Sequence, residues 1–323
     1  MNTCCGWRKK PNEVHAGRCA RSFRAMSKRG EIWLIGERGM LGRQIAGALH
    51  QGGLDFFASD REVDIGDLSA LQAFSENKKI SWIINCAAYT AVDLAESESE
   101  AAFLLNALGT ENLARLASGL DARLVHFSTD YVFDGNLRRP YREDDLPRPL
   151  SQYGLSKWQG EKRLAAHCRS AFIFRISWLY GVFGANFVHT VLRLFRENDQ
   201  VRVVDDQFGS PTYARVLARN IVRLIASDSP RFGLYHYCDH GVISWHEFAA
   251  AIMERALRCG WLEKKIALTA IPSVAYPTRA FRPAYTALDS AKAVRELGFE
   301  VRDWSCNLDD FFAEKMRLES KPK

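Results

Sequence analysis

The chain has 323 residues and a mass of 36.6 kDa, with 47% hydrophobic and 25% charged residues. This composition excludes a fibrous or disordered protein, and the length suits one large domain or two. The formal charge of +6 would suggest nucleic acid or an anionic membrane as partner, but residues 1–30 hold eight basic residues against one acid, which leaves −1 for the rest. We therefore expect no nucleic-acid partner.

The leading segment, residues 1–29, is predicted to lie outside the packed fold, because it is basic and has no apolar periodicity. It is either disordered or not translated, with Met26 as the start, or it is an Arg-rich targeting peptide. The eight cysteines form no paired C-x-x-C sets and are interpreted as reduced thiols of a cytoplasmic protein. No apolar run reaches the roughly 18 residues that cross a bilayer, so no membrane partner is expected.

Strands and helices are predicted to alternate from residue 31. Strands are expected at 31–36, 54–60, 80–86, 123–128 and 172–176, with helices at 40–49, 68–74, 101–116 and 153–167 and a polar, Pro-rich loop at 134–150. Such alternation is typical of parallel βαβ units. The predicted fold class is α/β: a Rossmann-type doubly wound parallel sheet over 30–177, with a smaller α/β substrate domain over 178–320 that is partly interleaved with the first.

Three glycines, Gly36, Gly39 and Gly42, lie between the first strand and the first helix. Glycine lets a phosphate approach backbone N–H groups, and the helix N-terminus favours negative charge, so this position predicts a dinucleotide site. Asp60, at the end of the second strand, is placed to bind the adenosine ribose hydroxyls of NAD, whereas Arg61 could pair with the 2′-phosphate of NADP. The choice between NADH and NADPH stays open.

Tyr153 and Lys157 lie four residues apart on one predicted helix face, after the loop that follows the strand at 123–128. A nearby cation lowers the pKa of a tyrosine, as a proton donor to a carbonyl requires. Thr129 ends the preceding strand and would complete a set able to hold and protonate a carbonyl oxygen. We predict these three residues as catalytic.

Together these features resemble the extended short-chain dehydrogenase/reductases, and within them the dTDP-4-dehydrorhamnose reductase branch. The similarity extends from about residue 32 to 308. Its motifs are 85–93, 128–135, 153–157 followed by Gly160 and Glu161, 175–178, 186–188, 206–212 and 282–285. The resemblance implies NADPH- or NADH-dependent reduction of the C4 ketone of dTDP-4-dehydro-L-rhamnose, and it leaves a homodimer open.

Residue roles follow from the same resemblance. Expected cofactor contacts are Gly36, Gly39, Met40, Leu41, Gly42, Asp60, Arg61, Asp64, Ile65, Cys86, Ala87, Ala88, Tyr153 and Lys157. Expected contacts to the dTDP-sugar substrate are Tyr89, Thr90, Thr129, Asp130, Trp178, Asn186, Gln207 and Arg282.

Two residues of this chain differ from the patterns of related families and limit the reactions and ligands that we expect. Dehydratases among the relatives have an acid after the Thr-Asp pair, where this chain has Tyr131, so simple ketone reduction is expected. Some members hold Mg²⁺ between subunits through a glutamate where this chain has Gln44, so no metal is predicted.

Two other functions stay open at this stage. One is a non-catalytic NADP-binding subunit similar to methionine adenosyltransferase β, which the intact Thr129, Tyr153 and Lys157 disfavour. The other is a nucleotide-sugar epimerase, which would keep its NAD bound through turnover.

Overall fold

Six parallel strands form the central sheet in the computed structural model, which describes residues 30–320. They are β1 (Glu31–Ile35), β2 (Phe56–Ser59), β3 (Ile80–Asn85), β4 (Arg123–Thr129), β5 (Ala171–Ile176) and β10 (Gly233–Tyr237), in the order β10-β5-β4-β3-β1-β2. The order reverses at β1 and β3, and ligands of open α/β sheets bind at such a switch point, beyond the carboxyl ends of the strands. The expectations for residues 1–29 lie outside the described residues.

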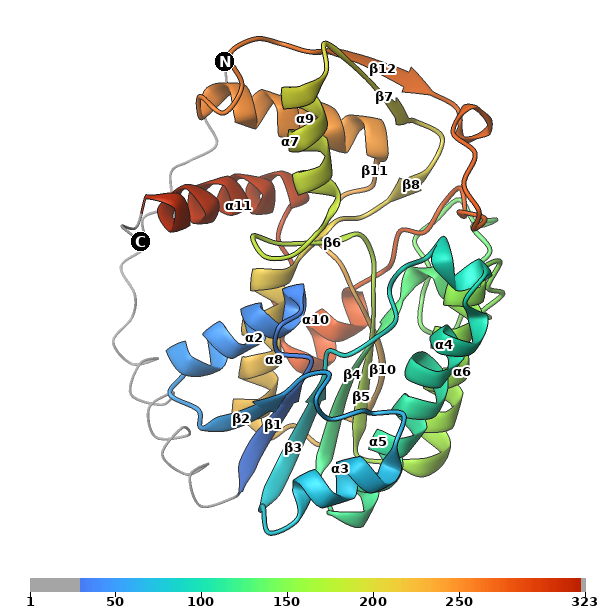
Figure 1. Ribbon diagram of the computed structural model, residues 1–323, viewed down its shortest axis with the longest axis vertical. Helices are drawn as coiled ribbons and strands as arrows, with labels where there is room; N and C mark the ends of the chain where they lie inside the picture. Colours follow the sequence, from blue (N-terminus) through green and yellow to red (C-terminus); the bar gives the residue numbers. More distant parts are fainter. Residues whose placement is uncertain (1–29, 321–323) are drawn as a thin grey trace.

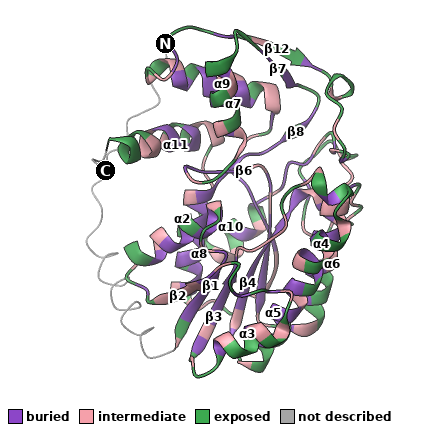
Figure 2. Ribbon diagram, viewed as in Figure 1, coloured by how far each residue is buried: buried purple, intermediate pink, exposed green. Residues whose placement is uncertain are grey.

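Helices cover both faces of this sheet (Figure 1). One face carries α2 (Met40–Gln51), α8 (Ala214–Ser227) and α10 (Ala291–Leu297), and the other carries α3 (Leu68–Ser75), α5 (Thr110–Gly119) and α6 (Gln152–His167). The strands are buried almost throughout, whereas the helices expose their outer sides (Figure 2). The predicted Rossmann-type doubly wound parallel sheet is confirmed.

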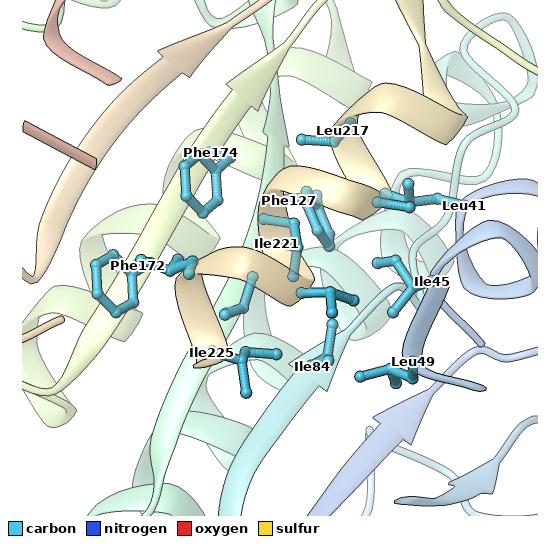
Figure 3. Close-up of a cluster of buried hydrophobic side chains, with 14 of the residues drawn as sticks. Leu41, Ile45, Leu49, Ile84, Phe127, Phe172, Phe174, Leu217, Ile221 and Ile225 are labelled. Carbon is cyan, nitrogen blue, oxygen red and sulfur yellow. The ribbon is translucent and has the colours of Figure 1, made fainter. Parts of the chain in front are cut away.

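The core between α2, α8 and the sheet is packed with branched aliphatic and aromatic side chains (Figure 3). Helical spacing in α2 places Leu41, Ile45 and Leu49 on one side, toward Ile221 of α8 and Phe127 of β4. The apolar face of α2 is therefore buried, and its N-terminus is fixed against the end of β1.

The sheet takes its sixth strand from beyond residue 177, where the sequence analysis had ended the first unit. The strand β10 pairs with β5 in parallel, and α8 and α10 pack on the same core as α2. The chain thus returns to the sheet after leaving it at β5.

A second group of elements lies beyond the carboxyl ends of the strands, at the top of Figure 1. It contains α7 (Phe187–Glu197), α9 (Trp245–Arg258) and α11 (Trp304–Glu319), and β7 (Gln200–Val204) paired in parallel with β12 (Ala267–Ile271). Short strands β6 (Leu179–Tyr180), β8 (Phe208–Gly209), β9 (Thr212–Tyr213) and β11 (Ile243–Ser244) connect them. This group has its own hydrophobic core.

The helix expected at 101–116 is broken into α4 (Ser99–Phe103), a π-helical segment (Leu104–Gly109) and α5. Asn106 lies in the π segment, and its amide bonds both backbone polar groups of Tyr89. A π segment adds one residue to a turn, and such insertions gather at functional sites. None of the described helices is long and apolar enough to cross a membrane.

Candidate active site

The glycine loop between β1 and α2 approaches the neighbouring strand too closely for any side chain. Gly36 has φ +78°, and a Cβ there would lie 2.7 Å from the backbone nitrogen of Ala87. A Cβ on Gly42 would lie 2.1 Å from the Gly36 carbonyl oxygen. The loop therefore forms a side-chain-free cradle at the N-terminus of α2, which fits a pyrophosphate.

A cavity of about 760 Å³ opens beside this loop at the switch point. It is lined by the following predicted cofactor or substrate residues: Gly36, Gly39, Asp60, Arg61, Asp64, Ile65, Cys86, Ala87, Ala88, Tyr89 and Thr90. Five predicted cofactor residues are absent from its lining, and two of them, Tyr153 and Lys157, lie on α6. Of the other three, Met40 lies near Gly181 and Gly184, the Leu41 side chain is in the core, and Gly42 packs closely against Gly36. We refer to this space as the lower cavity.

Charged side chains surround the Asp60 end of the lower cavity. The Asp60 carboxylate accepts backbone N–H bonds from Arg38 at 3.0 Å and Arg61 at 2.9 Å. Arg38, which the sequence analysis did not single out, lines the cavity and pairs with Glu62 at 3.3 Å. Two guanidinium groups and one fixed carboxylate therefore stand where an adenosine ribose would lie.

Thr129 and Tyr153 come together from β4 and α6. Ser151 caps α6 by accepting from the Gly154 N–H at 3.2 Å, which begins the helix one residue before Tyr153. Burial raises the pKa of Tyr153 to about 12, against a hydrogen bond from Thr129 that lowers it. The Thr129 hydroxyl also lies 3.0 Å from a carboxylate oxygen of Asp130. At neutral pH Tyr153 is thus a protonated phenol held beside a second hydroxyl.

Lys157 does not act on Tyr153 as the helical spacing predicted. Its Nζ reaches across to β4, where it donates to the Phe127 carbonyl at 2.5 Å and lies 3.5 Å from Nε2 of His126. Burial lowers the pKa of Lys157 to about 8, while Glu161 and then Cys86 raise it. The expected lowering of the Tyr153 pKa is therefore wrong for this arrangement, because burial dominates and the ammonium has other partners.

Asn106 connects α6, the helix that carries Tyr153 and Lys157, with the lower cavity. Besides bonding the backbone of Tyr89, its Nδ2 donates to the Ser156 hydroxyl at 3.0 Å. A Cβ on Gly160 would lie 2.1 Å from the Asn106 carbonyl oxygen, so α6 packs closely on the π segment. Sequence reasoning missed Asn106, although an asparagine within an apolar helical run was a signal.

A buried ion pair supports α6 from below. Arg175 on β5 binds the Glu161 carboxylate through Nη2 at 2.7 Å and Nε at 3.0 and 3.2 Å, with both side chains at most 6% exposed. The Ser128 hydroxyl also donates to Glu161, and Arg175 Nη1 lies 3.4 Å from Nε2 of His236. Such a pair fixes the rotation of α6, and hence where Tyr153 and Lys157 point.

A second space, the upper cavity, lies under α7 and β7 and has a volume of about 670 Å³. Gln207, Arg282 and Tyr131 line it together with Trp245 and Tyr276. Arg282 is held by Asp93 through paired bonds of 3.1 and 2.8 Å, which raise the pKa of Arg282 against its burial, and Gln207 donates to Ser273 at 2.8 Å. An arginine and an amide at a cavity wall suit a diphosphate and a base edge.

Two predicted substrate residues have other positions. Asn186 caps α7: its Oδ1 accepts from the His189 N–H at 3.2 Å and its Nδ2 donates to the Gly181 carbonyl at 2.8 Å. Trp178, with φ +46°, stacks on Trp245 at 3.4 Å between ring centroids and is absent from the cavity lining. Trp245, which sequence reasoning missed, presents the aromatic surface instead.

Three further residues were predicted to contact the substrate. Tyr89 donates its hydroxyl to Glu98 at 2.6 Å, and Thr90 is exposed at the rim of the lower cavity. Asp130 is buried, and burial raises its pKa to about 6 in spite of hydrogen bonds from Thr286 and Thr129.

No group of three or more histidine, cysteine, aspartate or glutamate residues within 30–320 is arranged to hold a metal ion. Gln44 is buried within α2, with its Nε2 inside the fold. A buried amide is a poor match for Mg²⁺, which prefers carboxylates and water at an accessible position.

Two of the three predicted catalytic residues contact residues that line the cavities, although none of the three lines either cavity itself. The ring of Tyr153 packs edge-on against Tyr131, which lines the upper cavity, at 6.0 Å between centroids. Lys157 faces Cys86, which lines the lower cavity. A half-buried phenol that packs against the wall of the upper cavity can protonate an oxygen bound between that cavity and the glycine cradle.

Comparisons with known proteins show what the chain is similar to. The family model of the RmlD substrate binding domain matches residues 30–317. A dTDP-4-dehydrorhamnose reductase of Shigella flexneri is 41% identical over 283 residues, which cover 84% of this chain and 94% of that protein. Two crystal structures superpose with a TM-score of 0.83, each covering 88% of this chain and 99% of the other. They are a dTDP-4-dehydrorhamnose reductase of Clostridium acetobutylicum at 35% identity and that of Bacillus anthracis in complex with NADP at 36%.

Proposed function

The chain belongs to the RmlD substrate binding domain family, and from that membership we propose that it reduces the C4 ketone of dTDP-4-dehydro-L-rhamnose to dTDP-L-rhamnose. It is an oxidoreductase that uses a nicotinamide cofactor. The observation that supports the proposal is that Tyr153 packs against Tyr131 of the upper cavity, which Arg282 and Gln207 also line, while Lys157 faces Cys86 of the lower cavity.

Each of these residues has a separate role in the proposed reduction. A reduced nicotinamide, when bound, supplies the hydride. Tyr153 donates its proton to the oxygen that becomes the C4 hydroxyl, and it is protonated for this at neutral pH because burial raises its pKa to about 12. The Thr129 hydroxyl, now directed at Asp130, is near enough to Tyr153 to turn toward the same oxygen. Gly36, Gly39 and the N-terminus of α2 hold the cofactor pyrophosphate.

One assay tests the proposal as a whole. The protein is incubated with dTDP-4-dehydrorhamnose and NADPH or NADH, and cofactor oxidation is followed, with UDP-linked ketosugars for comparison. We expect oxidation with the dTDP-sugar. No consumption of any ketosugar with either cofactor would remove the enzyme proposal and favour a binding subunit.

The upper cavity is proposed to hold the nucleotide diphosphate, with Arg282 as its cation. Arg282→Ala should raise KM for the dTDP-sugar about 10- to 100-fold and change kcat little, because charge-assisted hydrogen bonds contribute about 1.5–3 kcal/mol. The measurement is steady-state kinetics in the sugar at saturating cofactor. Arg279→Ala, an exposed arginine of the same loop, is the matched control and should leave KM unchanged. A loss confined to kcat would place Arg282 elsewhere in the mechanism.

We propose that both NADPH and NADH are accepted, with a preference for NADPH that Arg38 and Arg61 provide. The fixed Asp60 carboxylate keeps lone pairs free for ribose hydroxyls, while the two guanidinium groups can bind a 2′-phosphate. The double variant Arg38→Ala/Arg61→Ala should lower the ratio of kcat/KM for NADPH over NADH by about tenfold or more. Arg223→Ala, an exposed arginine of α8, is the control. An unchanged ratio would contradict these roles.

We also propose that the protein works in the cytoplasm. All five cysteines within the described residues are free thiols, which suits a reducing compartment.

A further inference from the structure

His126, which has no part in the reaction as proposed, lies directly against Lys157. It is 1% exposed on β4, with Nε2 at 3.5 Å from Lys157 Nζ. On its other side, Asn85 Nδ2 lies 3.1 Å from His126 Nδ1, and Asn85 Oδ1 lies 3.0 Å from the Ala87 backbone nitrogen. These contacts form one hydrogen-bond chain, which runs from Ala87 at the lower cavity through Asn85 and His126 to Lys157.

The direction of each bond in this hydrogen-bond chain follows from the first donor, the Ala87 N–H. The Ala87 N–H can only donate, so it fixes the Asn85 oxygen toward itself and the Asn85 NH₂ toward His126. An amide NH₂ can only donate, and His126 Nδ1 must therefore accept. Burial, and then the charge of Lys157, hold the pKa of His126 well below its usual value, so the ring is neutral. A neutral ring that accepts at Nδ1 carries its proton on Nε2.

The Nε2–H bond of His126 then points at Lys157. An ammonium has only donors and cannot accept it, whereas a neutral amine has a lone pair that can. The Phe127 carbonyl accepts an N–H from Lys157 in either state, and more strongly from the ammonium, so it opposes the effect of His126. The hydrogen-bond chain through Asn85 and His126 therefore favours the neutral amine of Lys157 over its ammonium.

No other group facing Lys157 offers an unengaged negative charge. Glu161, one turn further along α6, is bound by Arg175 and Ser128. The Cys86 thiol, one residue after β3, is neutral, because burial raises its pKa. Tyr153, on the same helix, is a neutral phenol.

We propose that Asn85 and His126 are positioning residues that make Lys157 a proton donor at neutral pH. The proposal rests on the proposed function. Tyr153 loses its O–H proton to the new C4 alkoxide, and the Lys157 ammonium, turning from the Phe127 carbonyl toward Tyr153, gives up an N–H proton to restore the phenol. The lysine electron pair that this frees accepts the His126 N–H, and water returns a proton to Lys157 before the next turnover.

The tautomer is tested first, in the full-length protein without substrate or cofactor. In protein labelled with ¹⁵N-histidine, two-bond ¹H–¹⁵N spectra should show His126 protonated on Nε2, with its signals assigned by their loss in His126→Gln. His236 is the internal control for the opposite tautomer, since its Nδ1 lies 2.9 Å from the Tyr141 carbonyl and its Nε2 faces Arg175. A His126 that is charged, or protonated on Nδ1, overturns the proposal.

The effect on Lys157 is tested with Asn85→Asp. A carboxylate still accepts from the Ala87 N–H but also accepts from His126, so the ring proton moves to Nδ1 and Nε2 becomes an acceptor for the ammonium. The alkaline limb of kcat/KM for the sugar against pH should move upward by about one pH unit or more. His126 should show the exchanged tautomer in the same spectra, while His236 stays unchanged.

A double variant separates the tautomer from the added charge. In the His126→Leu background, Asn85→Asp should no longer move the alkaline limb, and a shift of the same size there would overturn the proposal. If the wild-type protein consumes no ketosugar, the proposed function fails, yet the spectra still decide the tautomer.

Discussion

Tyr153→Phe should lower kcat roughly 10²- to 10⁴-fold, because it removes the phenol that is proposed to donate the proton to the C4 oxygen. The phenol is buried and keeps its proton at neutral pH, and the Thr129 hydroxyl beside it has a much weaker tendency to give up a proton. The cofactor should bind as before, since the glycine cradle and the Asp60 region do not involve this hydroxyl. Stopped assays of sugar reduction and fluorescence titration with NADPH measure the two quantities.

The matched control is Tyr276→Phe, which removes a hydroxyl from an exposed tyrosine of the upper cavity. It should change KM for the sugar by a few-fold at most and leave kcat intact. If Tyr153→Phe retained a substantial part of the wild-type kcat, another group would have to be the proton donor, and the assignment of α6 as the catalytic helix would fail.

Arg175→Leu should lower the free energy of unfolding by about 3–5 kcal/mol, because it leaves the Glu161 carboxylate buried without its cation. For a chain of this size that corresponds to a fall in Tm of about 10 °C. Thermal unfolding followed by circular dichroism measures it. The lost stability arises at the sheet, beneath the helix that carries Tyr153 and Lys157.

Two companion variants decide whether the buried charge is the cause. Arg193→Ala breaks the exposed pair of Arg193 with Glu197 and should change stability by about 0.5 kcal/mol or less. The double variant Arg175→Leu/Glu161→Leu removes both charges and should recover most of the loss. A double variant no more stable than Arg175→Leu would show that lost packing, rather than an unpaired carboxylate, accounts for the effect.

Local patterns in the sequence were enough to predict five of the six strands of the sheet and the cradle. The glycine spacing after β1, the acid after β2 and the position of Tyr153 depend on neighbours within a few residues, and the structure places Gly36 and Asp60 at one cavity. The same holds for the end of β4 at Thr129. Asn186 has the sequence signature of a helix cap, since an asparagine directly before an apolar helical run is a common N-cap.

Contacts between distant segments could not be predicted. Trp178 and Trp245 are 67 positions apart, and only the packed structure shows which of the two faces the cavity. Lys157 and Tyr153 do share a helix face, but periodicity does not reveal that a carbonyl on β4 competes for the ammonium. His126 was assigned to a strand, where a buried histidine gives no sign of its partners.

The return of the chain to the sheet at β10 limits how this protein can be divided or recombined. Residues 30–177 alone would leave the edge of β5 unpaired and the apolar face of α2 without α8, and exposed edges and faces of this kind promote aggregation. Exchanging the substrate-binding part with that of a relative would therefore need several crossover points, placed around α8, β10 and α10. A new sugar specificity is more readily sought by altering side chains of the upper cavity than by grafting a contiguous half.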